Sequence, residues 1–215
     1  MTQRTLLIKS AIALITGAIL VVVCYWVVDR PVAWFVHDHR MCPREFWRWP
    51  PILSGWMKDA ALLSIIPLIL WWACKPGSRL QTVLLAGTTA WIVAALLKQF
   101  SKVAAGRYWP ETWKEHNPSL ISSGDYGFNP FHFGAAFESF PSGHAAVVCA
   151  VAAVLWIGYP RGRWLYGVIC ASVCVTLVGM NYHFVSDVIA GGILGSITGI
   201  YISRLFRLHG PEPSP

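Results

Sequence analysis

The chain has 215 residues, of which 55% are hydrophobic and only 13% are charged, and its formal net charge is +7 at pH 7. Because soluble domains carry about 25% charged residues, this composition excludes a disordered chain, a coiled coil and an ordinary cytosolic enzyme. A basic chain could bind nucleic acid, but 12 Trp in so apolar a sequence favour the anionic membrane surface as its partner. We therefore predict an integral membrane protein that binds no nucleic acid.

Six apolar runs are long enough, or nearly long enough, to cross a bilayer as helices, which takes about 20 residues each. The first run is longer than the apolar region of a signal peptide and no cleavage site follows it, so we interpret it as a retained helix. The sequence predicts an all-α fold, a six-transmembrane-helix bundle in one domain at residues 1–208, with a disordered tail at 209–215. The six runs lie at residues 5–28, 60–74, 80–97, 145–159, 164–182 and 188–203.

The short loops at residues 75–79 and 160–163 contain Lys and Arg but no acidic residue. Short basic loops stay in the cytoplasm under the positive-inside rule. An even number of helices places both termini on that same side. We therefore predict cytoplasmic termini and two long loops, at residues 29–57 and 102–143, on the periplasmic face of a bacterial inner membrane.

The two long loops differ in their expected roles. The first mixes tryptophans with Arg40, Arg44 and Arg48, which is typical of a segment in the headgroup region. The second is rich in aromatic residues, which argues against disorder, so we expect an ordered extracytoplasmic cap over the active site. Neither the six cysteines nor His37 and His39 have the spacing of a metal site, so no metal or other cofactor is predicted.

Three polar clusters meet at the outer face, because helices of alternating direction end there. They are Lys102 with Arg107, the Pro-Ser-Gly-His run at 141–144, and His183 with Asp187. Ionisable residues at membrane depth are costly and are functional by default. We therefore expect the three clusters to form one site.

The first two clusters suit a phosphate group. Ser142 and Gly143 stand at a helix start, where unbonded backbone N–H groups and the helix dipole favour anions. Lys102 and Arg107 add positive charge, and a guanidinium can bond two phosphate oxygens at once. These four residues are the predicted phosphate-binding set.

The third cluster suits nucleophilic catalysis. His183 and Asp187 are spaced i and i+4, so they share one face of a continuing helix. A carboxylate that holds one imidazole nitrogen leaves the other nitrogen available to attack or to carry a proton. His144 supplies a second imidazole that can protonate a leaving group. His183, His144 and Asp187 are therefore the predicted catalytic residues, and the pattern indicates phosphoryl transfer.

These motifs resemble those of the type 2 phosphatidic acid phosphatase superfamily, whose pattern is Lys-x6-Arg-Pro, Pro-Ser-Gly-His and Ser-Arg-x5-His-x3-Asp. Residues 141–144 match the second motif completely, and His183 with Asp187 matches the end of the third. The chain departs from the pattern at Trp109 and Leu177, which stand where the family has phosphate-binding arginines. We expect Arg107 to substitute for one of these arginines and Asn181 to substitute in part for the other.

The resemblance implies a metal-independent membrane phosphatase. His183 would attack phosphorus to form a phosphohistidine, Asp187 would orient it, and His144 would protonate the leaving oxygen. The phosphate would be held by Lys102, Ser142 and Gly143.

The expected substrate is a lipid phosphate or pyrophosphate at the outer face of the inner membrane, and the large aromatic loop favours the bulky headgroup of lipid A. A lipid phosphotransferase would carry the same residues. A transporter would use His183, Asp187 and Lys102 as a relay, but no inverted repeat is visible. A non-catalytic scaffold would explain the missing arginines and the small-residue stripe at Gly191, Gly195 and Gly199, which suits either internal packing or dimerisation. The oligomeric state stays open.

Overall fold

The computed structural model describes residues 3–39, 49–74, 77–112 and 116–208. Over these ranges the chain forms helices, turns and a few isolated β-bridges. The predicted disordered tail at 209–215, and the first-loop arginines Arg40, Arg44 and Arg48, lie outside the described residues. The all-α prediction is confirmed.

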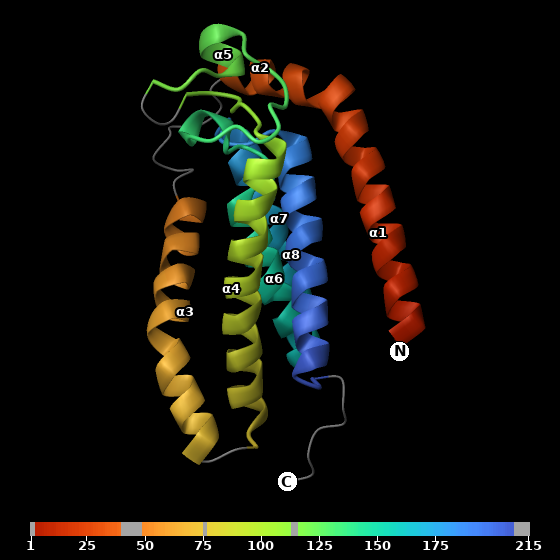
Figure 1. Cartoon of the computed structure of the whole chain (residues 1–215), viewed down its shortest axis with the longest axis vertical. Coiled ribbons are helices and arrows are strands. Elements are labelled where there is room, and N and C mark those ends of the chain that lie inside the picture. The colour runs from red at the N-terminus through yellow and green to blue at the C-terminus, as the bar shows by residue number, and fades with distance from the viewer. Residues whose placement is uncertain (1–2, 40–48, 75–76, 113–115, 209–215) are drawn as a thin grey trace.

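Six long helices run side by side along the molecule (Figure 1). Five stretches are long and apolar enough to cross a membrane by length and composition, whereas α6, with 16 residues, is shorter. Each predicted apolar run overlaps one of these helices, so the count of six membrane crossings stays a prediction consistent with the fold. The helices are α1 (Gln3–Val23), α3 (Trp49–Cys74), α4 (Arg79–Ala105), α6 (Gly143–Gly158), α7 (Arg163–Gly179) and α8 (Val185–Leu205).

Helices α6 and α8 pack with their backbones in close approach. A methyl group added at Gly195 would lie 2.0 Å from the Ala146 carbonyl oxygen, and one added at Gly199 would lie 2.2 Å from the Ala150 carbonyl oxygen. Only glycine permits such contacts. The small-residue stripe of α8 therefore serves packing inside the chain.

The first helix does not end where its apolar run ends. It continues through a π-helical turn (Cys24–Val28) into α2 (Asp29–His39), which bends over the end of the bundle (Figure 1). The prediction of a loop from residue 29 is therefore wrong over this stretch, and α3 already begins at Trp49. The reason is that Asp29 interrupts an apolar run without interrupting a helix.

The connection between α4 and α6 lies over the same end of the bundle as α2 (Figure 1). It leaves α4 at Gly106, whose φ of 57° and contact with the Asn129 carbonyl, 1.7 Å from where a Cβ would lie, exclude any larger residue. The segment then contains a short helix, α5 (Leu120–Ser123), and a 3-10 turn at Ala135–Phe137. This path returns the chain across the bundle end to Ser142, which caps the first turn of α6.

Candidate active site

A cavity of about 300 Å³ lies at the bundle end that α2 and the α4–α6 connection cover. It brings together residues from α4, the connection, the start of α6 and the α7–α8 turn, which are far apart in the sequence. Four of the predicted site residues line it: Lys102, Gly143, His144 and His183. The other lining residues are Trp91, Lys98, Gln99, Trp109, Glu138, Val147 and Tyr182.

The two histidines face the same cavity from different elements. His144 lies in the first turn of α6, and His183 lies in the turn before α8, where it is 2% exposed. Their ring centroids are 6.3 Å apart. Trp109 packs on His183, with its ring centroid 5.2 Å away, and donates its Nε1–H to the Ala135 carbonyl at 2.6 Å. Both imidazole rings therefore border the same cavity.

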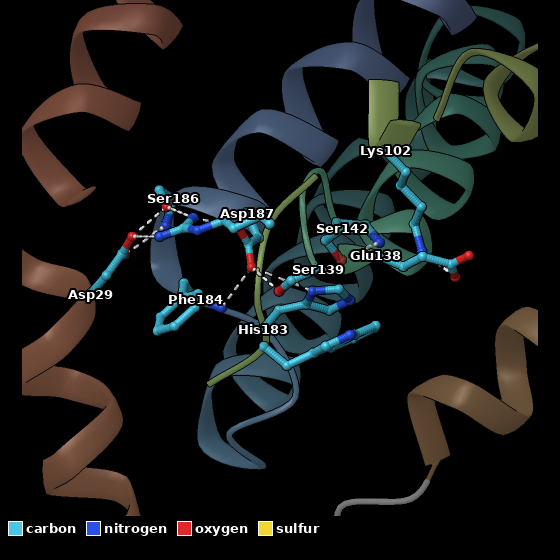
Figure 2. Close-up of polar contacts among 12 residues, drawn as sticks. Asp29, Lys102, Glu138, Ser139, Ser142, His183, Phe184, Ser186 and Asp187 are labelled. Carbon is cyan, nitrogen blue, oxygen red and sulfur yellow. Dashed lines mark hydrogen bonds and ion pairs between the residues drawn. The ribbon is translucent and has the colours of Figure 1, made fainter. Parts of the chain in front are cut away.

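Asp187 lies directly behind His183, in the first turn of α8 (Figure 2). Its Oδ2 is 3.6 Å from His183 Nδ1. The same oxygen accepts hydrogen bonds from the Ser139 hydroxyl at 2.6 Å and from the Phe184 backbone N–H at 3.0 Å. The carboxylate is therefore fixed by its neighbours with one oxygen toward the imidazole. His183 lies in the turn before α8, so the two residues do not share a face of one continuous helix, although their spacing had suggested that they would.

Arg107 lies on the far side of Asp187 from His183, although we predicted that it would bind phosphate. It is fully buried and donates from Nη1 to Asp187 Oδ1 at 2.5 Å and to the Ser186 hydroxyl at 2.6 Å. Its Nη2 donates to Asp29 Oδ2 at 2.8 Å. The left-handed turn at Gly106 changes the direction of the chain just before Arg107. The guanidinium therefore bridges two carboxylates, and Arg107 is not among the residues that line the cavity.

Four aromatic rings surround the Arg107 guanidinium at 4.3–5.5 Å from its central carbon, which adds cation–π attraction to the two ion pairs. Burial acts to lower the pKa of Arg107, but Asp187 and Asp29 outweigh it, so the pKa lies above its ordinary value. The side chain is a permanent, fully buried cation. The rings belong to Tyr25, Tyr126, Phe128 and Phe184.

Asp29 is a site residue that the sequence reasoning missed. It is 1% exposed, begins α2, and accepts hydrogen bonds from Arg107 and from the Ser186 backbone N–H at 3.0 Å (Figure 2). The Ser186 hydroxyl also donates to Asp29 Oδ2, which closes the ring of bonds. The available signal was an acid at the end of an apolar run, since a carboxylate at membrane depth requires a partner.

Lys98 is the second residue that was missed. It stands one helical turn before Lys102 on α4, and a Cβ built at Gly143 would lie 2.8 Å from its Nζ. The ammonium therefore lies against the first turn of α6. Lys102 Nζ lies 3.7 Å from a Glu138 carboxylate oxygen and 5.7 Å from the Trp109 ring (Figure 2). The i, i+4 spacing of the two lysines was the available signal.

The remaining predicted positions have structural partners. The Ser142 hydroxyl accepts the Ala145 backbone N–H at 3.4 Å as the cap of α6, and Ser142 is not among the residues that line the cavity. Leu177 is buried in the core, and the Asn181 amide donates to the Ala33 carbonyl of α2 at 2.9 Å. Trp109 forms a wall of the cavity. Lys98 lines the cavity, whereas Asn181 is not among the residues that line it.

The surroundings of His183 favour its neutral form. Burial, as the largest influence, and the nearby Lys102 lower its pKa, while Asp187 acts in the opposite direction, and the net shift is downward. Burial also raises the pKa of Tyr182, with a contribution from Glu138. No group of three or more His, Cys, Asp or Glu in the described part of the chain is arranged to hold a metal ion. The site thus offers a neutral imidazole, a second imidazole and two ammonium groups around one cavity.

Comparison with known proteins identifies the family of the chain. The family model of the PAP2 superfamily matches residues 82–210. A lipid A 1-phosphatase of Rhizobium etli is 32% identical over 177 residues, which are 73% of this chain and 73% of that protein. An undecaprenyl-diphosphatase of Sulfolobus acidocaldarius is 42% identical over 59 residues, 27% of this chain and 29% of that one.

Among solved structures, the crystal structure of a PAP2-type phosphatidylglycerolphosphate phosphatase from Bacillus subtilis superposes with a TM-score of 0.55. The match covers 92% of this chain and 95% of the other at 17% identity. At that identity the likeness shows the shared fold alone.

Proposed function

The chain belongs to the PAP2 superfamily and is a membrane lipid phosphatase, and we propose that its substrate is lipid A phosphorylated at the 1-position. The observation that carries the choice of substrate is the match to the Rhizobium etli lipid A 1-phosphatase over 73% of both chains. The cavity lies at the bundle end under a connection rich in aromatic residues, which suits a large amphipathic headgroup.

The reaction proceeds through the phosphohistidine that is general to this superfamily. The phosphoryl group occupies the cavity that His144 and His183 both line. His183 Nε2 attacks phosphorus, the bond from phosphorus to the lipid oxygen breaks, and His144 gives that oxygen a proton. His144 then accepts a proton from water, which attacks the phosphohistidine and releases inorganic phosphate and neutral His183.

Asp187 stabilises the charge that develops in this step. When Nε2 bonds to phosphorus, the imidazole ring gains positive charge, and Asp187 Oδ2 lies 3.6 Å from its Nδ1. We assign Arg107 and Asp29 the role of positioning residues, because they hold Asp187 without contacting the cavity. The ring nitrogen that attacks is then fixed in both direction and protonation state.

The negative oxygens of the phosphoryl group are held by Lys98, Lys102 and the Gly143 backbone N–H at the start of α6. Two ammonium groups and a helix N-terminus stabilise the added charge of the transition state. Ser142 contributes by capping α6 and thereby fixing the direction of the Gly143 N–H. This set replaces the paired arginines of the family pattern.

We further propose that the chain resides in a bacterial inner membrane with its active site on the periplasmic side. The start of α1 and the end of α8 lie at the bundle end opposite the cavity (Figure 1). The start of α4 at Arg79 and the basic turn at residues 160–163 lie at that same end, which is the cytoplasmic end under the positive-inside rule. Lipid A phosphate groups would then reach the cavity from the outer leaflet.

The deciding experiment measures phosphate release by the purified protein in detergent containing EDTA. The substrates are lipid A, undecaprenyl diphosphate, phosphatidylglycerol phosphate and phosphatidic acid. We expect the highest kcat/KM for lipid A, loss of turnover in His183→Ala, and full turnover in Trp164→Phe, an exposed change at the other bundle end. Higher kcat/KM for another lipid would overturn the substrate, and full turnover of His183→Ala would overturn the nucleophile. Radiolabelled phosphate appearing on a second lipid would indicate a phosphotransferase.

A further inference from the structure

A second cavity, of about 900 Å³, lies at the opposite end of the bundle from the active site. Side chains from α1, α4, α6, α7 and α8 line it. Three of them are cationic, Lys9, Arg79 and Arg163, and none of the described residues that line this cavity is acidic. A cavity with only positive charge at its mouth selects an anion.

The two arginines are fixed by backbone carbonyls near the end of α6. Arg79 Nε donates to the Gly158 carbonyl at 2.9 Å, and Arg163 Nε donates to the Trp156 carbonyl at 3.3 Å. The Arg163 guanidinium also lies 5.7 Å from the Trp156 ring centroid. Since each bond uses Nε, both guanidinium groups are oriented before any ligand binds, which lowers the entropic cost of binding an anion.

An apolar groove of about 490 Å³ adjoins this cavity. It runs along α8 beside α1, and its lining includes Leu20, Ile189 and Ile193. The groove and the cavity share Ser196 and Ile200. Figure 1 shows the backbone of α1 diverging from that of α8 toward the N-terminus.

We propose that this joined space binds one anionic glycerophospholipid from the leaflet at the end that carries the termini. The headgroup phosphate lies among Lys9, Arg79 and Arg163, and the acyl chains occupy the groove between α1 and α8. Charge selects the headgroup and the apolar groove selects a lipid over a soluble phosphate. This site is independent of the proposed substrate, because the active-site cavity lies at the other end of the bundle.

The bound lipid has a structural consequence. Helix α1 leads through the π-helical turn to Asp29, which is bonded to Arg107 behind the catalytic Asp187. A lipid that fills the space between α1 and α8 holds α1 in place against the bundle. We therefore expect phosphatidylglycerol to raise the Tm of the protein as well as to bind.

The test is lipid binding to the whole delipidated protein in detergent, by native mass spectrometry and by thermal shift. We expect dioleoyl-phosphatidylglycerol to bind at a 1:1 ratio and to raise the Tm more than dioleoyl-phosphatidylcholine does. The triple variant Lys9→Gln/Arg79→Gln/Arg163→Gln should bind phosphatidylglycerol about tenfold or more weakly. Lysine at positions 79 and 163 should restore most of the binding, whereas the controls Arg161→Gln and Lys102→Gln should bind as the wild type does.

Three results would overturn the proposal. The first is equal binding of phosphatidylglycerol and phosphatidylcholine. The second is a triple variant that is less stable without lipid but still prefers phosphatidylglycerol to phosphatidylcholine as the wild type does. That result would mean that Arg79 and Arg163 only cap the end of α6. The third is a Tm increase with glycerol 3-phosphate equal to that with phosphatidylglycerol. Ser196→Phe, which fills the junction of cavity and groove, should lower lipid binding while Ser196→Ala retains it, and unchanged binding in Ser196→Phe would also contradict the site.

Discussion

Arg107 joins Asp187 to Asp29: its Nη1 lies 2.5 Å from one carboxylate and its Nη2 lies 2.8 Å from the other. Asp29 lies outside residues 82–210, the part of the chain that matches the PAP2 family model. The continuation of the first helix therefore supplies a carboxylate to the network that holds Asp187, which lies beside His183. The helix is part of the site as well as a membrane segment.

The first prediction concerns the ion pairs of Arg107. Arg107→Met leaves Asp29 and Asp187 buried without their cation, and breaking a buried pair of this kind costs about 3–5 kcal/mol. We expect a corresponding loss of unfolding free energy in detergent, measured by denaturant titration of the wild type and the variant. Arg161→Met, a change at an exposed arginine at the other bundle end, is the control and should lose far less. An Arg107→Met protein as stable as the wild type would contradict the bridging role.

A second prediction separates positioning from phosphate binding. Asp29→Asn keeps the shape of the side chain but removes its charge, so Arg107 is held less firmly and Asp187 is less well oriented. We expect kcat to fall about tenfold, at the low end of the range for outer-shell changes, while KM and inhibition by inorganic phosphate stay close to wild type. Asp29→Glu should recover part of kcat, and Asp38→Asn, a change at an exposed residue of the same helix, should have no effect. A rise in KM with unchanged kcat would place Asp29 in substrate binding instead.

A third prediction concerns the lysine that the sequence reasoning missed. Lys98 lines the cavity and lies against Gly143, so Lys98→Gln removes one of the two ammonium groups near the phosphate. We expect kcat/KM to fall roughly 10²-fold, as for other lost electrostatic stabilisers, together with weaker inhibition by inorganic phosphate. Gly143→Ala should act in the same direction, because its methyl group would lie 2.8 Å from Lys98 Nζ. The matched control is Lys58→Gln on the exposed face of α3, and equal kinetics for the two glutamine variants would rule out the assignment.

The sequence predicted the helices, and it singled out the two histidines that line the cavity, because their signals are local. Apolar runs, a helix-capping serine and an i, i+4 spacing can be read along the chain. Two of its errors of extent had one cause: the predicted helices stop at the charges Asp29 and Lys98, but the chain stays helical to His39 and to Ala105. These charges are tolerated at membrane depth because Asp29 pairs with Arg107 and Lys98 lines the active-site cavity. Both partners come from distant parts of the chain, so only the folded structure shows them.

The role of Arg107 was predicted wrongly for a different reason. Its closeness to Trp109 in sequence favoured a phosphate-binding role, since the family carries an arginine at that place. The left-handed turn at Gly106, with φ of 57°, and the buried Asp29 decide the direction of the side chain. Neither the turn nor the distant carboxylate can be inferred from the spacing of the motif.

The final prediction is the pH dependence of turnover. Burial and Lys102 hold the pKa of His183 below 6.5, so the nucleophile stays neutral at pH values where an ordinary histidine is half protonated. His183 is protonated, and so loses its nucleophilic lone pair, only as the pH falls through this lowered pKa. The acid limb of kcat/KM should therefore lie below pH 6.5. Lys102→Gln removes a positive charge that disfavours imidazolium, which raises the pKa of His183 and moves the acid limb to higher pH. The substrate phosphate titrates in the same way with both proteins. The difference between their kcat/KM profiles therefore reflects a group of the enzyme. The Lys58→Gln control should retain the wild-type limb, and a Lys102→Gln limb that stays in place or moves to lower pH would show that another group governs it.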